Sequence, residues 1–136
     1  MTEGMAIAAA ARALVGAPFR LHGRDPATGL DCVGLVAAAF RDAGITAHPP
    51  VGYRLRNRDI TAHLAMAARI GLFSVTGEHR PGDVVLAVPG PWQHHLLVAA
   101  DCRTFIHAHA GLGRVVALPG PLSWPVMRHW RYRTKD

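Results

Sequence analysis

The stretch DCVGLVAAAFRDA occupies residues 31–43 and joins a cysteine to the pattern of an apolar helix. Counted from Cys32, apolar residues recur at the third, fourth, seventh, eighth and eleventh positions, which is the spacing of one helix face. This spacing predicts a helix over Cys32–Ala43 with the thiol in its first turn. The unpaired N–H groups and the positive dipole end favour an anion there, so we expect the Cys32 thiol to ionise more readily than a free one. The alternative interpretation is a small buried cysteine at a helix start.

Length and composition indicate a single globular domain over residues 1–136, of which 50% are hydrophobic and 18% charged. No apolar run approaches the roughly 18 residues of a membrane span. The Ala-rich segment from Met1 to Val15 carries Glu3 and makes a poor secretion signal, so we expect synthesis in the cytoplasm without a signal peptide. The two cysteines, Cys32 and Cys102, predict no disulfide framework.

The formal net charge is +6, and 14 of the 15 basic residues are arginine. The arginines are spread along the chain and concentrate only at Arg128, Arg131 and Arg133. Such a balance suits an anionic polymer, either nucleic acid or the acidic cell wall. No helix-turn-helix, zinc-finger or aromatic-rich RNA motif accompanies it. We therefore expect no nucleic-acid partner, and generic surface charge is the simpler explanation.

Periodicity predicts helices in the first half of the chain and strands in the second. The expected helices cover Met5–Val15, Cys32–Ala43 and Ile60–Ile70, with Asp59 as the cap of the last. The segment His48–Arg58 is rich in proline and arginine and is expected to be an irregular surface loop. The expected strands cover Val84–Val88, His95–Ala100, Thr104–Ala108, Arg114–Leu118 and Met127–Arg133. Helices followed by an antiparallel sheet predict an α+β fold.

Two histidines share one face of the expected sheet if Val98–Phe105 forms a hairpin whose turn centres on Asp101. In that register His95 lies directly opposite His107, and directly opposed residues have neighbouring side chains. One imidazole can then act as a base toward a thiol while the other orients it.

The other histidines and the second cysteine are given lesser roles. His94 is expected to point to the opposite face of the sheet. His109 lies on the same face as His107, where it is either a substrate contact or a solvated strand residue. Cys102 falls at the hairpin tip and is interpreted as an incidental thiol. No role is assigned to His22, His48, His63, His79 and His129.

Cys32, His95 and His107 together predict a nucleophile, a base and an orienting group for acyl transfer. This chemistry needs no cofactor or metal. Two alternatives remain open. The chain is a non-enzymatic assembly component that keeps the fold, or Cys32, His95, His107 and His109 form a zinc site.

Five short segments follow one another along the chain: GAPFRLHG at residues 16–23, DCVGLV at 31–36, RPGDVV at 80–85, HLLV at 95–98 and FIHA at 105–108. They resemble the patterns G-x-P-Y-x-x-G-G, D-C-S-G-L-V, P-G-D-[LV], H-V-G-[IV] and [FV]-[IV]-H-A of the NlpC/P60 cysteine peptidases, which are papain-like cell-wall hydrolases. Each pattern is weak alone. Their common order and spacing make the resemblance specific over roughly residues 7–120.

This resemblance implies a papain-like fold in which N-terminal helices pack on a C-terminal antiparallel sheet. It implies Cys32 as the nucleophile, His95 as the general base and His107 as the residue that orients it. The implied substrate is the peptide stem of peptidoglycan, often cut at a γ-D-glutamyl–diaminopimelyl bond. The backbone N–H of Cys32 is then the expected oxyanion donor, and Asp31 is expected to cap the helix or hold the loop.

Two positions depart from the family pattern. Phe19 stands where tyrosine is usual and Val33 where serine is usual, and each replacement removes a polar group near the thiol. The form G-R-x-P-x-x-G-L-D-C-V-G at residues 23–34 resembles a phage-type branch found with tail genes of phages and gene transfer agents. We therefore expect proteins of a tail or tail-like particle as partners, and action on the cell wall, with the C-terminal arginines helping to hold its anionic surface.

Overall fold

The computed structural model describes residues 2–46 and 60–133. Within these residues the helices are α1 (Glu3–Ala13), α2 (Cys32–Asp42) and α3 (Thr61–Ile70). The strands are β1 (Arg24–Asp25), β2 (Gly29–Leu30), β3 (Leu72–Ser74), β4 (Val84–Ala87), β5 (His95–Ala99), β6 (Thr104–His109), β7 (Arg114–Pro119) and β8 (Val126–Tyr132). The predicted α+β class is confirmed.

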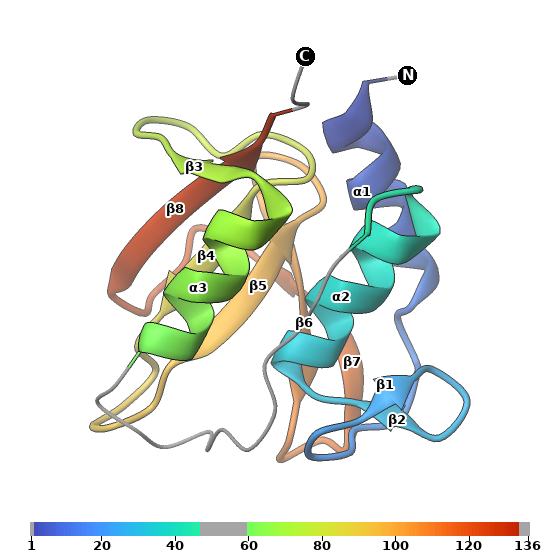
Figure 1. Cartoon of the computed structure of the whole chain (residues 1–136). Coiled ribbons are helices and arrows are strands. Elements are labelled where there is room, and N and C mark those ends of the chain that lie inside the picture. Colours follow the sequence, from blue (N-terminus) through green and yellow to red (C-terminus); the bar gives the residue numbers. More distant parts are fainter. Residues whose placement is uncertain (1, 47–59, 134–136) are drawn as a thin grey trace.

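The main sheet has the strand order β3-β8-β4-β5-β6-β7, and every neighbouring pair in it is antiparallel. Figure 1 shows the helices on one side of this sheet, with α1 beside α2. The short β1–β2 hairpin packs against α2. The N-terminal helices therefore cover one face of a C-terminal sheet, as the sequence predicts.

Helix α2 is the centre of the main core. All residues from Cys32 to Phe40 are buried, because the helix lies between α1 and the sheet and is apolar on every side. Its first turn is capped by Asp31, whose Oδ1 accepts the N–H of Gly34 at 2.8 Å. Gly34 is required at this position, since a Cβ there would collide with the carbonyl oxygen of Gly23. The β1–β2 segment can therefore lie directly on the start of the helix.

The face of the sheet away from the helices carries a second, smaller apolar cluster. Its buried members are Val85, Ala87, Leu97, Ala99 and Phe105. The end of β7 and the connection to β8 pack against it with Leu118, Leu122 and Trp124. Because side chains alternate along a strand, the odd-numbered histidines of β5 and β6 belong to the same face as this cluster. The cluster thus lies beside the predicted catalytic histidines.

The predicted register of the β5–β6 hairpin is wrong by two residues. Val98 pairs with Ile106 and not with Thr104, so the turn centres on Cys102 instead of Asp101. The longer turn is stabilised by the side chain of Asp101, whose Oδ1 accepts the N–H of Arg103 at 2.8 Å. His95 and His107 are consequently not directly opposite each other. A shift of two residues leaves every side chain on its original face, so the two histidines still share one.

Other local predictions are corrected in detail. Helix α3 begins at Thr61, and its N-cap is Ile60, whose side chain makes no capping hydrogen bond. The expected cap, Asp59, and the expected loop His48–Arg58 lie outside the described residues. The sequence pattern does not predict β3 or the β1–β2 hairpin, because each of these strands has only two or three residues and is too short to show a period.

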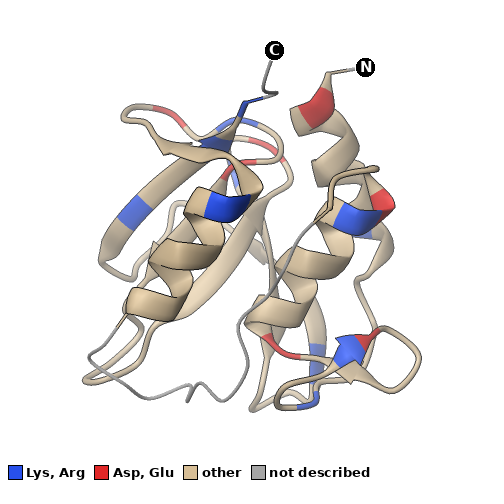
Figure 2. Cartoon of the chain, in the orientation of Figure 1, with Lys and Arg blue, Asp and Glu red and all other residues tan. Residues whose placement is uncertain are grey.

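Basic residues lie on several elements of the fold and do not gather on one of them (Figure 2). On β8, Arg131 is bound to the buried carboxylate of Asp83 through Nε and Nη2, each at 2.8 Å. The guanidinium of Arg133 lies 4.2 Å from the centre of the Phe73 ring. Arg131 and Arg133 thus also have partners within the fold, and a role of the three C-terminal arginines in holding an anionic surface stays a prediction. Across residues 2–46 and 60–133, no helix combines the length and apolar character needed to cross a membrane.

Candidate active site

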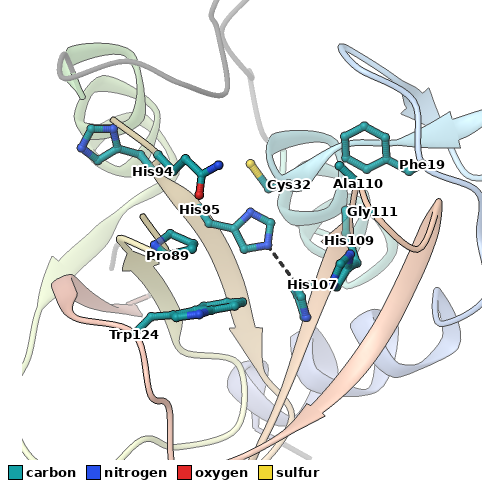
Figure 3. A pocket seen from close by; sticks show the side chains of 12 residues that line it. Phe19, Cys32, Pro89, His94, His95, His107, His109, Ala110, Gly111 and Trp124 are labelled. Carbon is teal, nitrogen blue, oxygen red and sulfur yellow. Dashed lines mark hydrogen bonds between the residues drawn. The ribbon is translucent and has the colours of Figure 1, made fainter. Parts of the chain in front are cut away.

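A cavity of about 340 Å³ opens beside the start of α2 and the β5 and β6 strands. Cys32, His95 and His107 all line it, as do Phe19 and His109 (Figure 3). The structure therefore brings the three predicted catalytic side chains into one cavity. The rest of the wall is formed by Pro89, Gln93, His94, Ala108, Ala110, Gly111 and Trp124.

Cys32 is the first residue of α2, and only 1% of its surface is exposed. The pKa of its thiol is raised to about 12: burial is the largest cause, hydrogen bonding from the backbone of Leu96 opposes the rise, and the neighbouring carboxylate of Asp31 adds to it. The expectation that this thiol ionises more readily than a free one is therefore wrong. The Asp31 side chain already caps the positive end of the helix. The cost of desolvating the thiolate therefore outweighs the stabilisation that the helix end can still give it.

His95 and His107 are joined by a short hydrogen bond. The distance from Nε2 of His95 to Nδ1 of His107 is 2.8 Å, and the two rings meet edge to face at 87°. In Figure 3 the Cys32 sulfur and His107 lie on opposite sides of the His95 ring. Since Nε2 of His95 is engaged by His107, its Nδ1 is the nitrogen left to face the thiol.

Both imidazoles are held in their neutral form. Burial, followed by the neighbouring imidazoles of His107 and His109, lowers the pKa of His95 from 6.5 to about 3. Burial, followed by His109, lowers the pKa of His107 to about 4. At neutral pH the resting site thus contains a neutral thiol and two neutral imidazoles.

Asp31 performs both of the functions that the sequence left open. It is fully buried, and its Oδ1 caps α2 as described above. Its Oδ2 accepts the backbone N–H of His22 at 2.8 Å, and Arg24 Nη1 lies 3.2 Å from Oδ1. Asp31 does not line the cavity itself. It holds the loop before α2 against the start of the helix.

Phe19 and His109 form part of the cavity wall. The backbone N–H of Phe19 donates to the carbonyl of Gly113 at 2.8 Å, which anchors its segment to the β6–β7 turn. Nδ1 of His109 accepts the N–H of Leu112 at 3.0 Å, so the neutral ring carries its proton on Nε2. Both side chains thus lie along the space in which a substrate would bind, and their contact with a substrate stays a prediction.

Two aromatic wall residues, Trp124 and His94, had no role assigned from the sequence. Trp124 makes edge-to-face contacts with both His95 and His107. It lies in the irregular connection between β7 and β8, where no periodic pattern indicates which way a side chain points. His94 also lines the cavity and is 8% exposed, although Figure 3 shows its ring turned away from that of His95.

The zinc-site alternative gains no support from the donor geometry. In the part of the chain that the structure describes, no group of three or more His, Cys, Asp or Glu side chains is arranged to hold a metal ion. Within the histidine pair, Nε2 of His95 and Nδ1 of His107 are engaged with each other.

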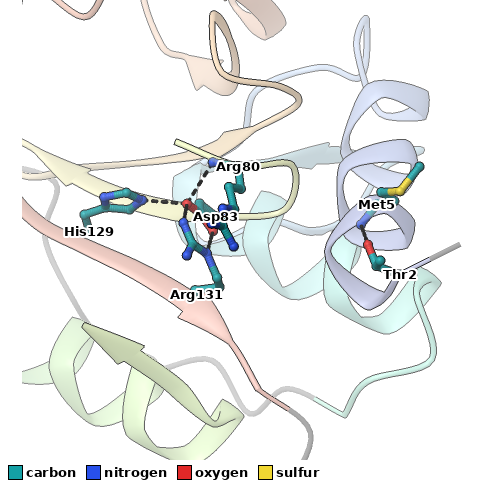
Figure 4. A network of polar contacts seen from close by, with 6 residues as sticks. All are labelled: Thr2, Met5, Arg80, Asp83, His129 and Arg131. Atoms are coloured by element: carbon teal, nitrogen blue, oxygen red, sulfur yellow. Dashed lines mark hydrogen bonds and ion pairs between the residues drawn. The ribbon is translucent and has the colours of Figure 1, made fainter. Parts of the chain in front are cut away.

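A second polar cluster lies outside the cavity, around Asp83 (Figure 4). The buried carboxylate accepts hydrogen bonds from Arg131, from the backbone N–H of Arg80 at 3.0 Å and from Nε2 of His129 at 2.6 Å. The ring of His79 lies against that of His129, with centres 4.4 Å apart. Burial alone raises the pKa of Asp83, but the bonds from Arg131, Arg80 and His129 together hold it below its ordinary value. This cluster ties the start of β4 to β8 and has no part in the cavity.

Comparison with known proteins gives a family match and a structural match. The model of the NlpC/P60 family matches residues 16–119. NlpC1 from Trichomonas vaginalis is 22% identical with a TM-score of 0.72, over 97% of this chain and 45% of that one. The NlpC/P60 domain of the peptidoglycan hydrolase SagA is 23% identical with a TM-score of 0.59, over 85% of this chain and 88% of that one.

The peptidoglycan hydrolase RipB from Mycobacterium tuberculosis is 19% identical with a TM-score of 0.65, over 94% of this chain and 63% of that one. The chain thus spans less than half of NlpC1 and under two thirds of RipB. A search of curated proteins gives no match. At these identities the structural likeness concerns the fold.

Proposed function

The chain belongs to the NlpC/P60 family, and from this premise we propose that it is a cysteine peptidase that hydrolyses the peptide stem of peptidoglycan. The observation that carries the proposal is the 2.8 Å hydrogen bond between His95 and His107 in the cavity that Cys32 also lines. SagA and RipB, two proteins of similar fold, are peptidoglycan hydrolases. The bond that we propose as the target is γ-D-glutamyl–diaminopimelyl.

In the first step of the proposed reaction the Cys32 sulfur attacks the carbonyl carbon of the scissile amide. Nδ1 of His95 takes the thiol proton as the C–S bond forms. Because burial raises the thiol pKa to about 12 and lowers that of His95 to about 3, an ion pair is not formed in advance. Proton transfer therefore accompanies attack, and His95 acts as a general base.

The remaining steps use the same groups. The backbone N–H of Cys32 at the start of α2 stabilises the oxyanion of the tetrahedral intermediate. His95 then gives its proton to the leaving amine, which leaves a thioester on Cys32. A water molecule, deprotonated by His95, hydrolyses the thioester and restores the thiol. Throughout, Nδ1 of His107 accepts the N–H at Nε2 of His95 and keeps the ring oriented.

Digestion of purified peptidoglycan tests this function. The wild-type chain should release peptides with a new carboxyl group on the glutamyl residue and a new amine on diaminopimelate, identified by mass. Cys32→Ala should release none of them. Absence of new fragments with folded wild-type protein, or the same fragments from the variant, would contradict the proposal.

We further propose that the enzyme acts with a phage tail or a tail-like particle of the gene-transfer-agent type. The support is the form GRDPATGLDCVG at residues 23–34, which resembles the phage-type branch. Mass spectrometry of purified particles from the source organism should detect the chain. Its presence in particles without any hydrolysis of peptidoglycan would favour a structural component that only keeps the fold.

A further inference from the structure

Trp124 is a cavity residue that the proposed chemistry leaves without a function. It belongs to the connection between β7 and β8, and its ring is partly buried. Its ring centre lies 5.9 Å from that of His95 and 5.7 Å from that of His107, with interplanar angles of 79° and 83°. Figure 3 shows the indole beside the histidine pair and below the His95 ring. One side chain thus contacts both partners of the hydrogen bond on which base catalysis depends.

The indole is itself held by the second apolar cluster. Trp124 packs against this cluster together with Leu118 and Leu122. Aromatic rings that meet edge to face attract each other beyond the effect of the area that they bury. The contacts therefore restrict the orientation of both imidazoles. They also cover the hydrogen bond with apolar surface, and a hydrogen bond in a medium of low dielectric constant is stronger than one in water.

We propose that Trp124 is a positioning residue, which holds the His95–His107 pair in its productive orientation and excludes water from the hydrogen bond between them. The inference rests on the proposed cysteine peptidase function. It adds a positioning residue to Cys32, His95 and His107, the three side chains of the proposed reaction. It also gives the β7–β8 connection a function in addition to packing.

The titratable groups around the histidine pair allow the role of Trp124 to be tested by pH dependence. Three titratable side chains line the same cavity: Cys32 from α2, His94 next to β5 and His109 from β6. The connection at residues 120–125 contains no charged residue, and the adjoining positions of β4, Val85 and Ala87, are apolar. Replacing Trp124 therefore changes the solvation of the pair without adding or removing a charge. Burial is the largest cause of the lowered pKa of both histidines, so hydration should raise both values.

Trp124→Ala and Trp124→Phe test the proposal, with Leu122→Ala as the matched control. Leu122 packs on the same cluster from the same connection but does not line the cavity. For Trp124→Ala we expect kcat on peptidoglycan to fall about 10- to 100-fold with KM within about threefold, since misplaced catalytic groups cost about that much. Trp124→Phe should recover much of the loss, and Leu122→Ala should keep wild-type kcat.

A second measurement needs no substrate. The rate of Cys32 alkylation by iodoacetamide, followed against pH in a Cys102→Ser background, reports the imidazole that assists the thiol. In Trp124→Ala, and to a smaller extent in Trp124→Phe, the acid limb of this profile should move upward toward pH 6.5. Leu122→Ala should leave it in place.

Three results would overturn the proposal. An unchanged acid limb in Trp124→Ala would show that the ring does not control hydration of the pair. A raised KM with normal kcat would make Trp124 a substrate contact. An equal loss of kcat in Leu122→Ala would reduce its role to packing. If peptidoglycan is not cleaved by the wild-type chain, the proposed function fails, while the alkylation profile still decides the role of Trp124.

Discussion

At Cys32 two local effects oppose each other. A position at the start of a helix lowers the pKa of a thiol, whereas burial raises it. Here the residue is 1% exposed, its helix end is occupied by the Asp31 carboxylate, and the pKa rises to about 12. In the proposed reaction, reactivity at this residue therefore depends on His95 and on the arriving substrate. The second cysteine, Cys102, is exposed on a hairpin turn with no such partner in the cavity.

We expect Cys32→Ser to abolish hydrolysis and Cys102→Ser to leave it unchanged, because only Cys32 lines the cavity. Iodoacetamide at neutral pH should modify the exposed Cys102 before the buried Cys32, and activity should decline only with the second, slower modification. Peptide mapping by mass spectrometry, together with fragment release from peptidoglycan, measures both. If activity were lost as Cys102 is labelled, the assignment of Cys32 as the nucleophile would be wrong.

His95 and His94 are adjacent in sequence and both line the cavity, but only His95 bonds to His107. We expect His95→Ala to lower kcat by about 100- to 10,000-fold, the usual value of general-base catalysis, with little loss of stability. His94→Ala is the matched control and should be far milder. Steady-state kinetics on soluble stem peptides would measure the two values. The reverse order would place the base on His94.

At the level of elements, the sheet is held together across its middle by the Asp83 cluster. Asp83 precedes β4, and its partners His129 and Arg131 lie on β8, more than 40 residues later in the chain. The sequence analysis recognised the PGD segment but gave no role to His129. The cluster has the form of a buried ion pair that is fully hydrogen-bonded, and removal of one partner leaves the other without compensation.

Asp83→Asn should lower the free energy of unfolding by about 1–3 kcal/mol, because hydrogen bonds to a charged group are lost while Arg131 remains partly buried. The contribution of Asp83 should be present above pH 3.8, the ordinary pKa, and should disappear as the pH falls through the lower pKa of the folded state. Urea titrations at several pH values would measure it. The control is Asp42→Asn, which removes an exposed ion pair with Arg41 and should change stability little.

At the scale of the whole molecule, three histidines among residues 2–46 and 60–133 are held neutral by the fold. The pKa of His79, His95 and His107 is lowered from 6.5, in each case with burial as the largest cause. Below pH 6.5 the unfolded chain binds protons at these positions, while the folded chain does not until the pH approaches the lowered values. The folded state is therefore penalised as the pH falls.

We expect the free energy of unfolding to decrease from pH 7 toward pH 4, by up to about 1.4 kcal/mol per pH unit for each histidine involved. His107→Asn should reduce this slope, because it removes one titrating group but keeps a side-chain acceptor for Nε2 of His95. Thermal or urea denaturation at pH 7, 6 and 5 gives the slope directly. Equal slopes in the wild type and the variant would show that His107 is protonated equally in both states.

The sequence alone determined the order of the three helices and the five longer strands, the position of Cys32 at the start of α2, and the shared face of His95 and His107. These features depend on local periodicity, and a period of two is insensitive to the register error of two residues in the β5–β6 hairpin. The catalytic roles of Cys32, His95 and His107 remain predictions. The NlpC/P60 resemblance was available from short segments in a fixed order, and the family match confirms it.

Only the tertiary structure decided the rest. The direction of the Cys32 pKa shift depends on burial, which is produced by α1, the sheet and the β1–β2 hairpin together. The contact of Trp124 with the histidine pair and the attachment of Asp83 to β8 join segments that are far apart in the chain. Neither contact has a local sequence pattern, because solvation and long-range packing are properties of the three-dimensional surroundings and not of neighbouring residues along the chain.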